Sequence, residues 1–142
     1  MNRNIIANYT TVAAGIIGVC VILTYVLTTI PLDREVYAGI IITLVSLIFL
    51  IMARLELGAS FTVRPRATAL VTTGIYSKIR HPIYVFAQFM ILGIILAIHG
   101  RWLILIWALL VFLQTKRARA EERVLEERFG ETYRAYKKTT WF

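Results

Sequence analysis

The sequence contains little cysteine, little acidic charge and no glycine-rich phosphate-binding motif. Its one cysteine, Cys20, lies in an apolar run, which excludes an intramolecular disulfide framework. No G-x-G-x-x-G follows a predicted strand and no alternation of strands and helices is visible, so a Rossmann-type domain is not predicted. Asp and Glu number 8 against 16 Lys and Arg, which gives a formal net charge of +8. The basic excess therefore needs an explanation.

Hydrophobic residues are abundant instead. They make up 58% of the 142 residues and the mean hydropathy is +0.71, whereas soluble domains are roughly 45–50% apolar. The run from Tyr9 to Ile30 carries no charge. As a helix it reaches about 33 Å, enough to cross a hydrocarbon core of roughly 30 Å. A second span is predicted over 36–53, and no small-residue cleavage site separates the two, so we expect the first span (9–30) to be retained.

Two further spans are predicted over 82–98 and 102–115. Pro82 stands at the first helical position of the third, where its missing N–H costs no hydrogen bond. The fourth run is short, but the helical spacing continues beyond it. Four residues share one face of that continuation: Ala118, Glu122, Leu125 and Phe129. The sequence thus predicts one all-α domain over 1–142, a polytopic membrane helix bundle with about four transmembrane helices and a cytoplasmic helix over 116–138.

The distribution of basic residues predicts the orientation. The connections between spans 1 and 2 and between spans 3 and 4 carry only Arg34 and Arg101, and the other basic residues lie at the N-terminus, between Arg54 and Arg80, and in the C-terminal tail. By the positive-inside rule both termini and the middle segment are cytoplasmic. Anionic lipid accounts for the positive charge. We expect no nucleic-acid partner, because the aromatic residues lie mostly in the spans.

Two polar clusters share that predicted cytoplasmic side. In GIYSKIRHPIY, Arg80 and His81 stand at a helix start, where backbone N–H groups favour anions; His81 is either a cap or a ligand for a carboxylate. Glu121 and Glu122 lie just beyond the last span. They form either a solvated ion-pair lattice or a carboxylate site for a cationic ligand at the interface. The two side chains point about 100° apart on a helix and need not have the same role.

The stretches LVTTGIYSKIRHPIY and RARAEERVLEERFGETYRAY resemble integral membrane methyltransferases of the isoprenylcysteine carboxyl methyltransferase and phospholipid methyltransferase group. That group carries LVTxGxY, RHPxY, EExxL, FGxxY and YxxY in this order and at similar spacing. The likeness covers roughly residues 55 to 138. Ile75 stands where the group often has proline, and the tail YKKTTWF lacks its usual Arg-Val-Pro continuation.

The resemblance implies a helical membrane enzyme that uses S-adenosylmethionine, yields S-adenosylhomocysteine and needs no metal ion. Its cofactor-binding residues correspond to Leu70, Val71, Gly74, Tyr76, His81, Tyr84, Glu121 and Glu122. Its catalytic positions correspond to Arg80, Tyr84 and Arg117, of which Arg117 matches an arginine that orients the acceptor. Tyr133 and Tyr136 match a terminal aromatic pair, for which packing and chemistry both stay open.

The chemistry of the donor suits these residue types. S-adenosylmethionine carries a sulfonium, an ammonium and a carboxylate, which call for an aromatic face, an acid and a hydrogen-bond donor. The expected acceptor is lipophilic and reaches the site laterally from the bilayer. If its nucleophile is a carboxylate no general base is needed, whereas an amine must first lose a proton, to a glutamate or to water.

Two other functional classes stay open at this point. An NADPH-dependent membrane reductase shares the design of a helical bundle with a cytoplasmic cofactor site, and a non-catalytic membrane subunit explains the spans and the charge. The expected setting is the same for all three: a multi-pass membrane protein, with the small number of spans favouring a prokaryotic cell membrane. Association into a homo-oligomer is left open.

Overall fold

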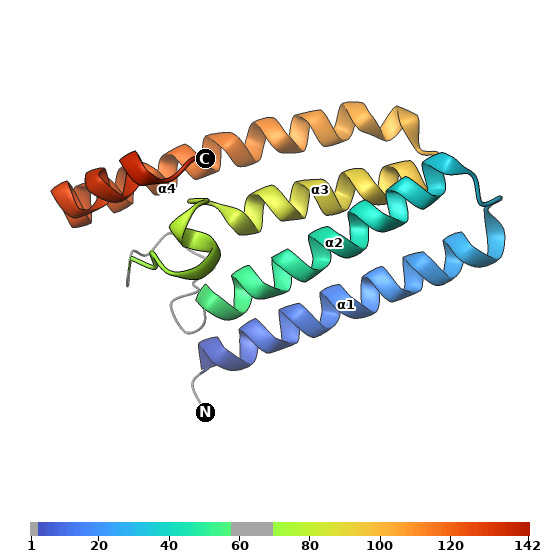
Figure 1. The fold of residues 1–142 in the computed structure, drawn as a ribbon, viewed down its shortest axis with the longest axis horizontal. Coiled ribbons are helices and arrows are strands. Elements are labelled where there is room, and N and C mark those ends of the chain that lie inside the picture. Colours follow the sequence, from blue (N-terminus) through green and yellow to red (C-terminus); the bar gives the residue numbers. More distant parts are fainter. Residues whose placement is uncertain (1–2, 58–69) are drawn as a thin grey trace.

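A computed structural model describes residues 3–57 and 70–142, with side chains from Tyr9 onward. These residues form the α-helices α1 (Arg3–Thr29), α2 (Arg34–Leu57), α3 (Pro82–Ala97) and α4 (Ile104–Thr139) and the short 3-10 helices η2 (Gly74–Ser77) and η3 (Arg101–Leu103). The described ranges contain no strand, which confirms the all-α prediction. The α-helices run along the long axis of the molecule, and each contacts the next in chain order (Figure 1).

Capping residues mark where α2 and α3 begin. The Val36 backbone N–H donates to Asp33 Oδ1 at 2.9 Å, which satisfies one of the donors left free at the start of α2. Pro82 occupies the first turn of α3, directly after His81. Because proline cannot donate a backbone hydrogen bond, it belongs at this position rather than deeper in the helix. Arg80 and His81 are therefore held at the start of α3, as the sequence predicts.

Small residues allow α2 and α3 to pack closely. A Cβ atom added to Gly39 would lie 2.5 Å from the backbone nitrogen of Ala97, and one added to Gly93 would lie 2.5 Å from Thr43 Oγ1. The Thr43 hydroxyl donates to the Gly39 carbonyl at 2.8 Å and so leaves no unpaired group in the contact. Backbones that approach this closely gain van der Waals contact in a lipid environment, where hydrophobic burial contributes little.

The outer surface of the bundle is strongly apolar. Ile17 is 64% exposed and Leu105 is 79% exposed, and many other aliphatic side chains also face outward. Two of the predicted spans, now Tyr9–Thr29 and Arg34–Leu57, are long and apolar enough to cross a membrane, and Pro82–Ala97 is apolar but shorter. The spans expected over 82–98 and 102–115 remain a prediction. Arg64 and Arg66, which contribute to the predicted cytoplasmic charge, lie outside the described residues.

One uninterrupted helix over 116–138 was the wrong expectation. Gly130 has φ 51° and ψ −124° inside α4, so the helix is broken there. The chain then turns back, and its last segment runs beside the preceding part of α4 (Figure 1). Glycine adopts a positive φ without the steric cost that a Cβ atom brings. The reversal returns the end of the chain to the start of α3.

Exposed ion pairs link the helices at the opposite end of the bundle. His99 Nε2 lies 3.0 Å from Asp33 Oδ2, and Arg101 Nη2 lies 2.5 Å from Glu35 Oε1. Asp33 directly precedes α2 and Glu35 lies in its first turn, whereas His99 and Arg101 belong to the connection between α3 and α4. These contacts join the two predicted extracytoplasmic connections.

Candidate functional site

Glu122 is the centre of a largely buried ionic cluster. Its Oε1 accepts a hydrogen bond from Arg80 Nε at 2.9 Å, and its Oε2 lies 2.8 Å from Lys137 Nζ. The Arg80 and Glu122 side chains are only 14% and 15% exposed. His81 Nε2 lies 3.5 Å from Glu122 Oε1, beyond the usual hydrogen-bond range, and it is buried without a hydrogen-bond partner among the described residues. The cluster joins the start of α3 to both sides of the break at Gly130.

The surroundings shift the pKa values of two members of this cluster. Burial lowers the pKa of His81 below its ordinary value of 6.5, although Glu122 and Glu121 act in the opposite direction. The imidazole is therefore neutral near pH 7. Burial alone would raise the pKa of Glu122, but hydrogen bonds from Lys137 and Arg80 outweigh it and lower the pKa below 4.5. A neutral histidine next to a carboxylate is suited to hydrogen bonding rather than to charge pairing.

Glu121 has a different set of partners. The Tyr84 hydroxyl donates to Glu121 Oε1 at 2.6 Å, and Arg117 Nε lies 3.2 Å from the same oxygen. The Tyr84 ring is stacked on the His81 ring, with centroids 5.6 Å apart and planes 13° apart. The two neighbouring glutamates thus take part in separate clusters, and the stacked rings of Tyr84 and His81 connect these clusters.

The η2 helix precedes α3 in the chain and packs beside the site. Gly74 has φ +57°, and the Ile75 N–H donates to Glu56 Oε2 at 2.8 Å. Tyr76 is buried, and its carbonyl accepts a hydrogen bond from the Tyr136 hydroxyl at 2.6 Å. The Tyr133 side chain is fully buried, which fits a packing role for the terminal aromatic pair. The reversed end of α4 is thereby held against η2.

The tail segment, residues Thr140–Phe142, lies across the start of α3. The Arg80 backbone N–H donates to the Phe142 carbonyl at 2.8 Å, and the Trp141 N–H donates to the Lys78 carbonyl at 3.0 Å. The Arg80 guanidinium also donates to the Thr140 carbonyl at 2.7 Å. The start of α3, where an anion is favoured, is thus covered by carbonyl oxygens of the tail segment.

A cavity of about 230 Å³ lies between α3 and α4. Its wall is mostly apolar and is formed by Tyr84, Val85, Gln88, Phe89, Trp107, Val111, Gln114, Thr115 and Phe142. Trp107 Nε1 donates to the Gln88 carbonyl at 3.0 Å and holds the two helices together beside it. Tyr84 is shared: its hydroxyl binds Glu121, and the residue lines the cavity. A polar site therefore meets an apolar cavity at Tyr84.

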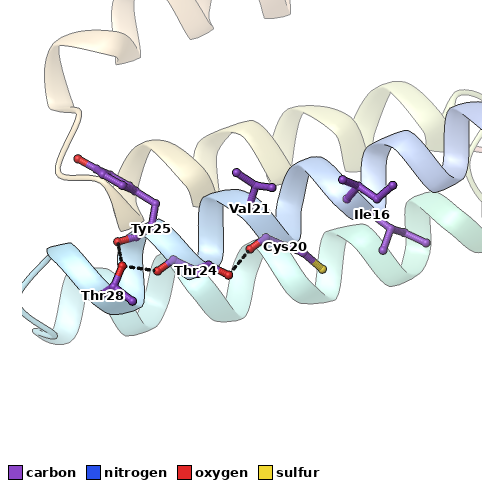
Figure 2. A pocket seen from close by; sticks show the side chains of 7 residues that line it. Ile16, Cys20, Val21, Thr24, Tyr25 and Thr28 are labelled. Atoms are coloured by element: carbon purple, nitrogen blue, oxygen red, sulfur yellow. Dashed lines mark hydrogen bonds between the residues drawn. The ribbon is translucent and has the colours of Figure 1, made fainter.

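A second hollow, on the outer face of α1, differs in kind. It has a volume of about 510 Å³, and its lining residues all come from α1 (Figure 2). Its threonine hydroxyls bond to carbonyls of the same helix, Thr24 to Cys20 at 2.9 Å and Thr28 to Thr24 at 2.8 Å (Figure 2). Among the described residues, its lining includes no charged side chain and no residue of a second helix, so it is a weaker candidate for a functional site.

The structure brings most of the sequence-predicted site residues together. Arg80, His81, Tyr84, Glu121 and Glu122 form the two linked clusters described above, and Arg117 joins Glu121. Gly74 and Tyr76 lie in η2, whereas Leu70 and Val71 are half-buried in the irregular chain before it. Their roles toward a cofactor or a substrate stay predictions.

Sequence reasoning missed the contacts of Lys137 with Glu122 and of Phe142 with the start of α3, and it gave no role to Gln88. The glycine in FGETY was the available signal for the first two, because a glycine inside a helical pattern can mark a reversal. A glutamine in an otherwise apolar span was the signal for the third.

Comparison with protein families gives a match to the phospholipid methyltransferase model over residues 34–132. Comparison with curated proteins found no match, and comparison with solved structures found none either. The family match includes the start of α3, the cavity residues that come from α3 and α4, and both glutamates, and it stops before Tyr133 and the cavity residue Phe142. Since the match covers well over half of the sequence, the chain belongs to the phospholipid methyltransferase family of membrane methyltransferases.

Proposed function

We propose that this protein transfers a methyl group from S-adenosylmethionine to a lipophilic acceptor held in the membrane. The observation that carries the proposal is the position of Tyr84. Its hydroxyl donates to Glu121 at 2.6 Å, while the residue lines the apolar cavity between α3 and α4. A charged methyl donor and a lipid chain need opposite environments, and Tyr84 stands where these two environments meet.

The donor set of the site fits S-adenosylmethionine. Carboxylates of Glu121 and Glu122 suit an ammonium group, and the Tyr84 ring offers an aromatic face to a sulfonium. Neutral His81, largely buried beside them, can donate a hydrogen bond to a carboxylate. When bound, the sulfonium supplies an already activated methyl group, so the protein has no need to form a covalent intermediate.

The contribution of the residues is then mainly positioning. Holding two reactants in line can supply about 7–11 kcal/mol of the barrier in favourable cases. Tyr84 is fixed by its hydrogen bond to Glu121 and by its stacking on His81, so its ring is held in one orientation. The side chains of Glu122 and Arg80 hold the start of α3 against α4 and keep this arrangement closed.

Arg117 is the residue that we assign to the acceptor. Its guanidinium lies 6.0 Å from the centre of the Tyr84 ring, and its side chain is 56% exposed. The Arg80 side chain is only 14% exposed and binds Glu122 and the Thr140 carbonyl, so Arg117 is the more accessible of the two arginines. For a carboxylate acceptor Arg117 provides a charge-assisted contact. For a lipid amine, Glu121 is the nearest group to take up the departing proton.

Binding of S-adenosylhomocysteine to the detergent-purified protein tests the proposal. Calorimetry should give saturable binding that is lost in Glu121→Ala and His81→Ala. Glu126→Gln is the matched control, because Glu126 pairs with Arg134 on the same helix, away from Tyr84. NADPH serves as the comparison ligand, and a membrane reductase would bind it instead.

A folded, monodisperse sample that binds neither S-adenosylhomocysteine nor S-adenosylmethionine would contradict the proposal. Equal binding by Glu121→Ala and by Glu126→Gln would also do so, since the cofactor would then lie elsewhere. Wherever binding is found, an acceptor screen with carboxylate and amine lipids separates O-methylation from N-methylation.

A further inference from the structure

Gln88 is the most unusual polar residue of the cavity between α3 and α4. Only 9% of the residue is exposed. Both atoms of its amide, Oε1 and Nε2, are shielded from solvent and lack a hydrogen-bond partner within the part of the chain that the structure describes. A buried amide without partners is costly, so its presence in an apolar helix calls for a ligand.

A second amide lies across the same cavity. Gln114, on α4, lines it together with Gln88, on α3, and Gln114 Oε1 is also buried and unpaired among the described residues. The surrounding wall is apolar, with Val85, Phe89 and Val111 among its residues. Polar side chains inside a membrane bundle usually hydrogen-bond across helices, and those without a partner are costly and point to a functional site.

The spacing between Gln88 and Tyr84 shows which part of a bound lipid would lie beside Gln88. The two residues are four positions apart on α3, hence on the same face and about 6 Å apart along the helix axis. A lipid whose head group meets Glu121 and Tyr84 would therefore have its chain linkage, rather than its head group, at the level of Gln88. A pure hydrocarbon at that level would leave both glutamines unpaired.

We infer that Gln88 and Gln114 form a recognition site for the linkage of the acceptor lipid, and that this linkage carries both a hydrogen-bond donor and an acceptor, as a secondary amide does. This inference rests on the proposed function. The Gln88 Nε2–H group donates to the linkage carbonyl, and Gln88 Oε1 or Gln114 Oε1 accepts from its N–H. A lipid with a hydroxyl beside an ester carbonyl offers the same pair of groups, whereas a simple ester satisfies the donor only.

Fluorescence of Trp107 provides the measurement. The chain has three tryptophans, and Trp107 is the one that lines the cavity. In a Trp102→Phe, Trp141→Phe background it reports alone. The probes are single-chain phosphoethanolamine lipids of equal length with a nitroxide quencher on the chain, linked through a secondary amide, an ester or an ether.

The amide probe should quench Trp107 with about tenfold higher affinity than the ether probe, with the ester probe between them. Gln88→Leu should abolish this preference, weakening the amide probe while the ether probe binds as well or better, because a buried unpaired amide has been removed. Gln114→Leu should reduce the preference less. Loss of recognition should weaken binding of the amide probe but not of the ether probe. Misfolding would weaken binding of both probes, so the two causes can be told apart.

Equal affinities of the wild-type protein for the amide and ether probes, or no quenching of Trp107 by either, would overturn the inference. Binding of S-adenosylhomocysteine, measured on the same samples, separates the two proposals. If the cofactor product binds and the linkage preference is absent, only the recognition site fails. If the product does not bind, the proposed methyl transfer fails first.

Discussion

The two ends of the bundle both carry pairs of acidic and basic side chains, but in different surroundings. At the end formed by the two short connections, Arg101 and Glu35 are 72% and 44% exposed, and His99 and Asp33 are 37% and 53% exposed. At the opposite end, Arg80 and Glu122 are 14% and 15% exposed. The same chemical pairing is thus solvated at one end and largely buried at the other.

The difference teaches what each end does. Exposed pairs gain little free energy, because water and salt screen the charges and two long side chains must be ordered. Buried charges are expensive unless each is matched, so a buried cluster is weak support for stability but strongly constrains geometry. The connection end therefore only joins α2 to the start of α4. The Glu122 end fixes the relative positions of α3, α4 and the tail segment.

The largest expected effect comes from removing the charge at the centre of the buried cluster. Glu122→Gln leaves Arg80 and Lys137 without their carboxylate. We expect the free energy of unfolding to fall by about 2–3 kcal/mol, somewhat less than for a fully buried pair, because Lys137 is 42% exposed. Circular dichroism during denaturant unfolding of the detergent-solubilised protein measures it.

Glu35→Gln is the matched control for this experiment, since it removes the same charge at the exposed end. If both variants lose the same amount of stability, the contrast between the two ends is not energetic. The buried cluster would then owe its existence to something other than the packing of the helices.

The next effect isolates the hydroxyl of Tyr84 from its ring. Tyr84→Phe keeps the stacking on His81 but removes the 2.6 Å hydrogen bond to Glu121. We expect about tenfold weaker binding of S-adenosylhomocysteine, equivalent to about 1.4 kcal/mol, close to the lower end of the range for a hydrogen bond to a charged group. Tyr37→Phe, an exposed tyrosine near the other end of the bundle, should leave the affinity unchanged. A similar loss in both variants would argue against a specific role for Tyr84.

A pH series tests the buried end through His81. Its pKa in the folded protein lies below the ordinary value of 6.5, so the unfolded chain takes up this proton at a higher pH than the folded one. Stability should therefore fall as the pH drops below about 6.5, by at most about 1.4 kcal/mol per pH unit. The pKa of Glu122 is lowered too, but from 4.5, so its contribution is lost only at more acidic pH.

His81→Asn is the variant for that series, because it removes the titrating group and keeps a hydrogen-bonding side chain. Between about pH 7 and pH 5 the variant should lose less stability than the wild-type protein. Parallel curves for both proteins would mean that another group, rather than His81, takes up the proton on unfolding.

The helical nature of the chain and the residues of the two clusters could be predicted from the sequence. Apolar runs without charge gave α1 and α2, and proline after histidine gave the start of α3, because both signals are local. The pairing of Arg80 with Glu122 could be expected in outline, since both lie at the same predicted membrane surface. Which glutamate binds which partner could not, because it depends on how α3 and α4 pack.

The path of the chain after Gly130 was predicted wrongly, as a continuation of the helix over 116–138. A single glycine is compatible with a continuous helix as well as with a break, and helical spacing continues on both sides of it. Only the break brings Lys137 to Glu122 and Phe142 to the start of α3. The charges of the tail were visible in the sequence, but the contacts that give them a role are long-range.

The smallest expected effect concerns the exposed end of the bundle and tests whether its ion pairs contribute to stability. Arg101→Gln removes the contact with Glu35, and the two side chains are so exposed that we expect the unfolding midpoint to stay within the error of the measurement. Raising the salt concentration weakens exposed ion pairs, but this pair is already screened by solvent. We therefore expect the loss of this pair at high salt to leave the unfolding midpoint of the wild-type protein unchanged. A clear drop in Arg101→Gln would mean that the connection end bears part of the stability of the bundle. The ion pairs there would then have to act by fixing the orientation of the start of α2 relative to the start of α4.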